Sequence, residues 1–262
     1  MKPYNRSRLT IQLTLLALAA LTIYGFLTFD YKDIQLGEAL QSTFQTIRTM
    51  FLEPHFKHFT LVEALEQVAI TLGLAFLTTL FGAVLALFLG LFAARNLSSR
   101  WASVVIRGFV AFIRAVPTVL WVLIFAVAAG LGSVAAVVGM TFHSVGYLIK
   151  AYSESFEELD GGVIEALKSS GANWWQIVFQ AVIPSTMSYL ISWTFLRFEI
   201  NFAVSVAMGA AAGAGGIGYD MFMASSFYYD VREIGTITYF ILALAVLMEV
   251  LANRLKRKLR SA

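Results

Sequence analysis

Residues 67–94 read QVAITLGLAFLTTLFGAVLALFLGLFAA, a run without one charged side chain. About 20 mostly apolar residues suffice to cross roughly 30 Å of hydrocarbon, and a helix is favoured there because it pairs its own backbone groups. This run therefore predicts a membrane-spanning helix. Since other apolar runs accompany it, the sequence predicts an all-α membrane protein.

The composition supports this interpretation. Of 262 residues, 59% are hydrophobic and 13% are charged, whereas a soluble domain carries about 25% charged residues. The net charge is +3, and the basic residues gather at ends and loops, which indicates membrane topology rather than nucleic-acid binding. Because the chain has no cysteine, disulfides, zinc–thiolate sites and thiol catalysis are excluded.

We predict six spans. The first follows Lys2, Arg6 and Arg8, and its apolar run is longer than a signal-peptide core of about 7–15 residues, so we expect it to stay uncleaved. A tight turn at Gly130 and Gly132 separates the third span from the fourth. The predicted spans cover about 9–29, 67–94, 109–129, 131–149, 182–208 and 234–253.

The distribution of Lys and Arg predicts the orientation. One set of connections is rich in basic residues: Lys2, Arg6, Arg8, Arg95, Arg100, Arg107, Lys150, Lys168, Arg254, Lys256, Arg257, Lys258 and Arg260. The alternate set holds only Lys32, Arg48, Lys57 and Arg232. Both termini are therefore expected in the cytoplasm, which agrees with an even number of spans.

The first external segment, 30–66, carries apolar residues at helical spacing, namely Leu40, Phe44, Ile47 and Phe51. This pattern predicts an amphipathic helix on the outer surface. It can rest on the membrane or receive an external partner. We accordingly divide the chain into 1–66, the first span with this segment, and 67–262, the main transmembrane domain.

A segment at 150–182, expected in the cytoplasm, predicts a compact knob. Glu165 lies near the expected start of a short helix, where the dipole favours an anion, and Gly171 can end that helix with a positive φ. A second amphipathic stretch, Trp174 to Phe179, follows, and Pro184 opens the fifth span. On physical grounds a knob and an ordinary interfacial loop are equally good interpretations.

This segment resembles the coupling motif of ABC importer permeases, an E-A-A sequence followed by Gly and a hydrophobic–Pro pair. Glu165, Ala166, Gly171, Ile183 and Pro184 match that motif, while Leu167 replaces its third residue. The resemblance implies that the knob docks into a cytoplasmic ATPase subunit, whose closure moves the spans between inward-open and outward-open states.

Further motifs resemble the phosphonate-type (PhnE-like) permeases over about residues 70–253. They are Arg114-Ala-Val-Pro117, Phe142-His-Ser-Val-Gly-Tyr-Leu-Ile-Lys150, Glu154 through Gly161, Arg197-Phe-Glu-Ile-Asn201 and Gly213-Ala-Gly-Gly-Ile-Gly218. One departure concerns cargo: where many relatives have a basic residue after the fifth-span Asn, this chain has Phe202-Ala203.

The resemblance implies a type I ABC importer permease bundle in a bacterial plasma (inner) membrane. It implies a homodimeric pore, two cytoplasmic ATPase subunits that bind ATP and Mg, and an extracytoplasmic substrate-binding protein. This chain lacks the phosphate-cradling G-x-x-x-x-G-K-S/T loop, so we expect it to need no cofactor and catalyse no reaction. The cargo implied is a phosphonate, with phosphite, hypophosphite, phosphate or an amino acid as alternatives.

Gly213, Gly215 and Gly218 also fit the dinucleotide fingerprint G-x-G-x-x-G. That fingerprint works only between a strand and a helix, and here it follows a predicted span, so we reject a nucleotide site. With Gly216, these residues are interpreted either as a gate at the outer mouth, as the resemblance implies, or as a tight re-entrant turn.

Arg197, Glu199 and Asn201 fall near the middle of the fifth predicted span, where a lipid-facing charge costs at least about 2.5–3.5 kcal/mol. Arg197 and Asn201 share one helix face, while Glu199 points nearly opposite. Two interpretations remain: Arg197 lines the pore and attracts an oxyanion, or the charges are structural, with Arg114 or His143 as partners of Glu199.

No catalytic constellation is visible, which disfavours a membrane enzyme, and no inverted repeat is visible, which disfavours a stand-alone secondary transporter. His55 and His58 near Glu53 resemble metal-ligand spacing only weakly, so no metal site is expected.

Overall fold

A computed structural model describes residues 6–29 and 35–261, so Lys2 and Lys32 lie outside the described residues. The chain is 85% helical, and no strand occurs in the described ranges. It divides into two compact units, residues 1–47 and 48–262, which we describe separately. The all-α prediction is therefore confirmed.

The first unit holds α1, Arg6–Thr28, and most of α2, Leu36–Leu52. No charged residue interrupts α1 after Arg8, and its apolar side chains point in all directions, as in a helix surrounded by lipid. The predicted amphipathic helix exists as α2, on which Leu40, Phe44 and Ile47 are exposed.

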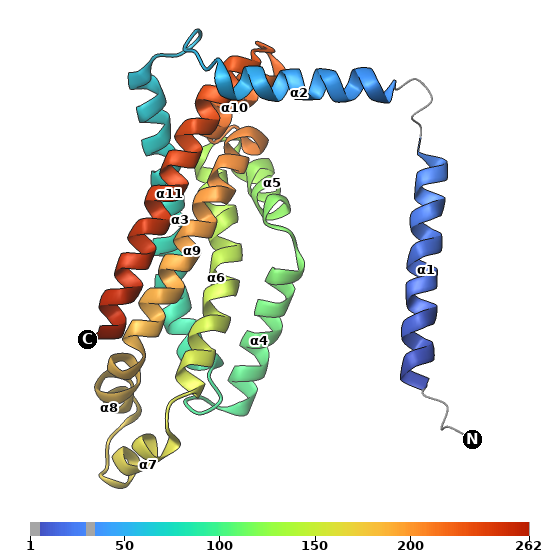
Figure 1. Cartoon of the computed structure of the whole chain (residues 1–262). Helices are drawn as coiled ribbons and strands as arrows, with labels where there is room; N and C mark the ends of the chain where they lie inside the picture. The colour runs from blue at the N-terminus through green and yellow to red at the C-terminus, as the bar shows by residue number, and fades with distance from the viewer. Residues whose placement is uncertain (1–5, 30–34, 262) are drawn as a thin grey trace. The chain divides into compact units, whose positions relative to one another are not determined.

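The second unit is the helical bundle of Figure 1. Its helices are α3 Leu61–Ala93, α4 Arg100–Ala115, α5 Thr118–Ala129, α6 Ser133–Glu157, α7 Gly161–Ser169, α8 Trp174–Ile177, α9 Ile183–Ala212, α10 Ile217–Ser226 and α11 Val231–Ser261. Five helices of the described chain are long and apolar enough to cross a membrane, and the bent pair α4–α5 makes a sixth if its halves form one span.

The third predicted span, 109–129, is wrong as a continuous helix. The structure instead has α4 and α5, which meet at an angle of 90°. Pro117 has no N–H group for helical hydrogen bonding, and it disfavours helical backbone at Val116, which is extended (φ −91°, ψ 124°). A proline at this point therefore ends one helix and begins another.

The other predicted spans exist, with shifted ends. The second begins at Leu61, because Thr60 and Glu63 form a capping box that starts α3 there. The fourth extends well past residue 149 as α6, which runs to Glu157. The fifth and sixth correspond to α9 and α11.

Close helix contacts in the bundle occur at small residues. At the α5–α6 crossing, a Cβ added to Gly139 would lie 2.5 Å from the Val122 Cα. At the α3–α6 crossing, one added to Gly82 would lie 2.9 Å from the Ser144 Cβ. Such contacts let backbones approach closely where lipid provides no hydrophobic driving force between helices.

We expect Gly139→Ala to destabilise the bundle by about 1–3 kcal/mol, because the new methyl group overlaps the backbone of Val122. The matched control is Gly73→Ala, since nothing lies within 4 Å of a Cβ at that helical glycine. Thermal unfolding in detergent measures both variants. An unchanged midpoint for Gly139→Ala would contradict the described crossing.

Candidate functional site

The knob projects from one end of the bundle, where α7 and α8 lie in Figure 1. The Asp160 side chain begins α7 by accepting a hydrogen bond of 2.9 Å from the Gly162 N–H. The helix therefore starts four residues before Glu165. The prediction that Glu165 benefits from the start of the dipole is wrong, because Glu165 lies in the middle of α7.

Gly171 ends this part of the knob as predicted, with φ +83°. Its N–H donates to the Lys168 carbonyl at 3.0 Å, and the Ala172 N–H donates to the Leu167 carbonyl at 3.0 Å, so the turn closes the helix end. Glycine adopts this left-handed conformation without the clash that a Cβ would cause. The chain then reverses toward α8.

The second stretch of the knob is fused to the fifth span. A capping box of Asn173 and Gln176 begins α8, and a π-helical turn, Val178–Val182, connects it to α9. Pro184 explains the wide turn, because its ring clashes with the carbonyl of an ordinary α-helical turn and it has no N–H to donate. The knob is therefore continuous with α9.

One side of the knob packs against the bundle, and the other side is exposed. The Trp174 indole donates to the Leu97 carbonyl at 2.7 Å and stacks on Phe92. Ile164 and Ile177 are buried in the main core. The opposite face exposes both polar and apolar groups: Val163, Glu165, Ala166, Gly171, Trp175 and Phe179.

Of the remaining motif residues, Ile183 packs against the core and Pro184 is exposed. Below the knob, Glu157 accepts hydrogen bonds from the Arg95 backbone N–H at 2.6 Å and from the Arg107 guanidinium at 2.5 Å. These bonds tie the connection after α3 and helix α4 to the end of α6. Hydrogen bonds thus hold together the part of the bundle next to the knob.

A polar network crosses the middle of the bundle at Arg197, which is only 3% exposed. Its Nε donates to the Ser144 Oγ at 3.1 Å, and Ser144 donates to the Asn201 Oδ1 at 3.1 Å. Asn201 in turn donates to the Thr79 Oγ1 at 2.9 Å. The network connects α9, α6 and α3, and Arg197 and Asn201 share a face as their spacing predicts.

The guanidinium of Arg197 has a favourable environment but no carboxylate. Its carbon lies 5.2 Å from the centre of the Tyr147 ring, a cation–π distance. Within the described chain, no acidic group lies at ion-pair distance from it. A buried positive charge without an anionic partner is suited to receive an anion from outside the chain.

Glu199 is part-buried and does not join this network. The structural pairing proposed for it is wrong for the described residues, because neither Arg114 nor His143 forms an ion pair with it. Ser144 and Tyr147 belong to the motif that spans residues 142–150, although no role was assigned to them, and Thr79 lies outside every motif. The signal for Thr79 was a polar side chain inside a predicted apolar span.

The glycine segment forms a tight reversal at the end of the bundle remote from the knob (Figure 1). Gly213, Gly215 and Gly216 all have positive φ. A Cβ on Gly218 would lie 1.8 Å from the Val206 carbonyl oxygen, so α10 lies directly against α9. Positive φ favours glycine at Gly213, Gly215 and Gly216, and the close approach of Val206 requires it at Gly218. The preceding element is a helix rather than the strand that a nucleotide fingerprint requires.

Side chains of α3 hold this reversal in place. The Gly216 N–H donates to the Gln67 Oε1 at 2.8 Å, and the Ile217 N–H donates to the Thr71 Oγ1 at 3.0 Å. Gln67 and Thr71 are therefore positioning residues for the glycine segment. Because these bonds cross from α3 to α10, opening the reversal would require breaking them.

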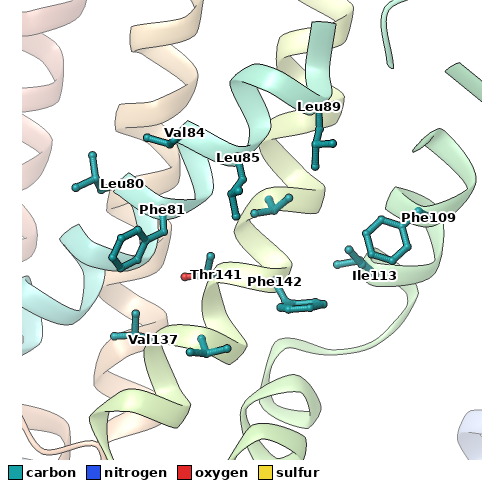
Figure 2. Close-up of a pocket in the computed structure, with 12 residues that line it drawn as sticks. Leu80, Phe81, Val84, Leu85, Leu89, Phe109, Ile113, Val137, Thr141 and Phe142 are labelled. Carbon is teal, nitrogen blue, oxygen red and sulfur yellow. The ribbon is translucent and has the colours of Figure 1, made fainter. Parts of the chain in front are cut away.

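The bundle also contains an apolar hollow of about 680 Å³ between α3, α4 and α6 (Figure 2). Phe81, Phe109, Ile113 and Phe142 line it with other aliphatic residues, and the one polar side chain among them is Thr141. Such a surface suits lipid or another apolar helix. It offers no charge to an oxyanion, so we place no anion site there.

The histidines do not pair with Glu53. That carboxylate binds Arg232 at 2.7 Å, whereas His55 and His58 contact Asp230 and Glu233 at the beginning of α11. Glu53 therefore does not join the histidines in a group of metal-ligating side chains among the described residues.

Known transport permeases resemble this chain in sequence. A permease relative from Mycolicibacterium smegmatis, the phosphate-import permease PhnE, is 31% identical over 76% of this chain, which spans 38% of that protein. The phosphite transport permease PtxC of Stutzerimonas stutzeri is 31% identical over 71% of this chain and 68% of its own length.

Solved structures show the same fold. The inward-facing MetNI methionine ABC transporter aligns over 78% of this chain and 99% of its own, with a TM-score of 0.70 at 22% identity. A bacterial ABC transporter for alginate import aligns over 97% of this chain and 99% of its own, with a TM-score of 0.65 at 16% identity.

The family model for the binding-protein-dependent transport system inner membrane component matches residues 86–261. This range contains the knob, the π-helical turn, the glycine reversal and the members of the Arg197 network other than Thr79. The chain is a multi-pass membrane protein that belongs to the family of binding-protein-dependent transport system inner membrane components.

Proposed function

We propose that this chain is the permease subunit of an ATP-driven importer for phosphonates or a related phosphorus oxyanion. The observation that carries the proposal is Arg197, a buried guanidinium that lies at mid-bundle and has no carboxylate partner in the described chain. Relatives named for phosphate and phosphite import support this class of cargo.

The transport path that we propose passes Arg197 and Asn201, with Glu199 near it and the glycine reversal as the gate at its outer end. Arg binds phosphoryl oxygens through charge-assisted, often bidentate hydrogen bonds. Tyr147 and Ser144 keep the guanidinium in place, and because Arg197 is 3% exposed here, the passage of an oxyanion requires the helices around it to separate. The hydrogen bonds that the N–H groups of Gly216 and Ile217 donate to side chains of α3 keep this gate closed.

We propose two copies of this chain per pore, two cytoplasmic ATPase subunits and an extracytoplasmic binding protein. The exposed face of the knob, with Glu165, Ala166 and Gly171, is the surface that we assign to the ATPase. In this assembly ATP and Mg bind to the partner ATPase, and this chain needs no cofactor. The apolar faces of the bundle contact lipid and the second copy.

Arg197→Gln should reduce uptake of a phosphonate about 10- to 100-fold, because it removes a charged hydrogen bond worth about 1.5–3 kcal/mol. Arg197→Lys keeps the charge but loses the planar fork, so we expect an intermediate loss. ATP-dependent uptake into proteoliposomes that contain permease, ATPase and binding protein measures both variants.

The control for that experiment is Arg8→Gln, which removes an exposed charge from α1. Yield and co-purification of the ATPase establish assembly. Wild-type uptake by an assembled Arg197→Gln transporter would contradict a pore role, and loss of assembly in both Arg197 variants would show that the residue is structural.

Gly171→Val should uncouple ATP hydrolysis from transport, because a β-branched residue at φ +83° distorts the turn that shapes the knob. Gly171→Asn is the matched control, since Asn tolerates left-handed backbone. Binding-protein-stimulated ATP hydrolysis in the assembled transporter measures both. If Gly171→Val keeps full stimulation and full ATPase co-purification, the assignment of the knob fails.

The proposed topology places both termini and the knob in the cytoplasm. The cysteine-free chain permits single-cysteine labelling, and Ser226 and Lys168 are exposed at opposite ends of the bundle. We expect Ser226→Cys to react with a membrane-impermeant maleimide in spheroplasts and Lys168→Cys to react only after permeabilisation. Labelling of both residues from one side would contradict the topology.

A further inference from the structure

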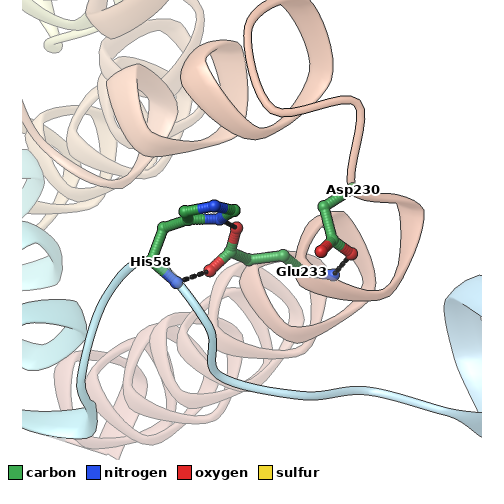
Figure 3. A group of neighbouring side chains, drawn as sticks. All are labelled: His58, Asp230 and Glu233. Carbon is green, nitrogen blue, oxygen red and sulfur yellow. Dashed lines mark hydrogen bonds and ion pairs between the residues drawn. The ribbon is translucent and has the colours of Figure 1, made fainter.

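A cluster of metal-ligating side chains lies away from the Arg197 network, at the end of the bundle where α11 begins (Figure 3). His58 comes from the segment before α3, and Asp230 and Glu233 come from the beginning of α11. One ligand atom from each of the three lies within 4.8 Å of the others. Chain positions about 175 residues apart thus meet at one point.

Glu233 is the centre of this cluster, and its side chain is 0% exposed. Its Oε1 accepts hydrogen bonds from the backbone N–H groups of Lys57, at 3.2 Å, and His58, at 2.7 Å. Its Oε2 lies 2.7 Å from the His58 Nδ1. One carboxylate oxygen is therefore fixed by the backbone, while the other faces an imidazole nitrogen.

A second histidine, His55, lies beside the cluster. The His55 Nε2 lies 3.0 Å from the Asp230 Oδ2, and the His55 side chain is 34% exposed. The His58 ring is held by stacking on Tyr228, with ring centres 3.9 Å apart. His55 thus contacts the cluster through Asp230, outside the group of three, and its partial exposure leaves it free to turn toward an ion there.

We propose that His58, Asp230 and Glu233, with His55 as the fourth ligand, form a structural Zn²⁺ site that fastens the segment before α3 to α11. Nitrogen and carboxylate oxygen are ligands that zinc binds at about 2.0–2.2 Å in a tetrahedron. Ligand atoms are then about 3.3 Å apart, so the His58–Glu233 pair opens by about 0.6 Å.

The charge balance also favours a cation. Asp230 and Glu233 bring two negative charges to the cluster, and the Lys57 Nζ, 3.7 Å from the Asp230 Oδ2, offsets one of them, so a net negative charge remains for a cation. Burial is the main reason that the pKa of the Asp220 carboxyl rises to about 6, and the charges of Glu233 and Glu63 raise it further. Burying a carboxylate is costly unless a cation or a full set of hydrogen bonds compensates it.

The test is zinc binding to the purified, full-length permease, carried on a tag without histidine and first stripped with EDTA. After ZnCl2 addition and removal of free metal, elemental analysis should find one zinc per chain. Zinc should also raise the thermal unfolding midpoint, because it binds the folded state. His58→Gln and Asp230→Asn should lose the bound metal, and His55→Gln should weaken binding about 10- to 100-fold.

Glu53→Gln is the matched control, because Glu53 pairs with Arg232 beside the cluster and contributes no ligand. It should retain one zinc per chain. Absence of zinc from the wild-type chain, or equal zinc in wild type and His58→Gln, overturns the proposal. Should either ligand variant fail to fold, Co²⁺ added to the wild type must give the absorption of a tetrahedral site, and an octahedral spectrum also overturns it.

Discussion

The structure of the bundle depends on the burial of one charged side chain, Arg197, inside the membrane. Arg197 lies at the midpoint of α9, and a lipid-facing charge at that depth would cost at least about 2.5–3.5 kcal/mol. The structure avoids this cost by turning the side chain inward, onto Ser144 and the Tyr147 ring. Asn201 and Thr79 extend the contact to α3, so three helices are held in register by one polar network.

This arrangement connects the two ends of the molecule. The knob is continuous with α9 through the π-helical turn, and α9 carries Arg197 before it reaches the glycine reversal. We propose that a displacement at the knob moves the helix that bears the network and the turn beyond it. Packed helices shift between discrete arrangements rather than deforming smoothly, which supports this proposal.

The sequence predicted the elements that follow from local chemistry. Apolar runs predicted the spans, and the turn at Gly171 and the shared face of Arg197 and Asn201 agree with the structure. Contacts between distant parts of the sequence could not be predicted. Spacing along the chain could not show that His58 contacts Glu233, because the two residues lie 175 positions apart. Hydropathy could not show the bend at Pro117, because an apolar residue has the same hydropathy in one continuous helix as in two helices. The placement of Glu165 failed because Asp160 caps the helix earlier.

We propose that Arg197 meets the cargo oxyanion, and a structure of the assembled transporter trapped with a phosphonate in the path measures this most directly. We expect phosphonate oxygens at about 2.7–2.9 Å from the guanidinium nitrogens, with Ser144 and Tyr147 still in contact with Arg197. A cargo molecule that passes elsewhere, while a carboxylate of the second copy pairs with Arg197, would contradict it.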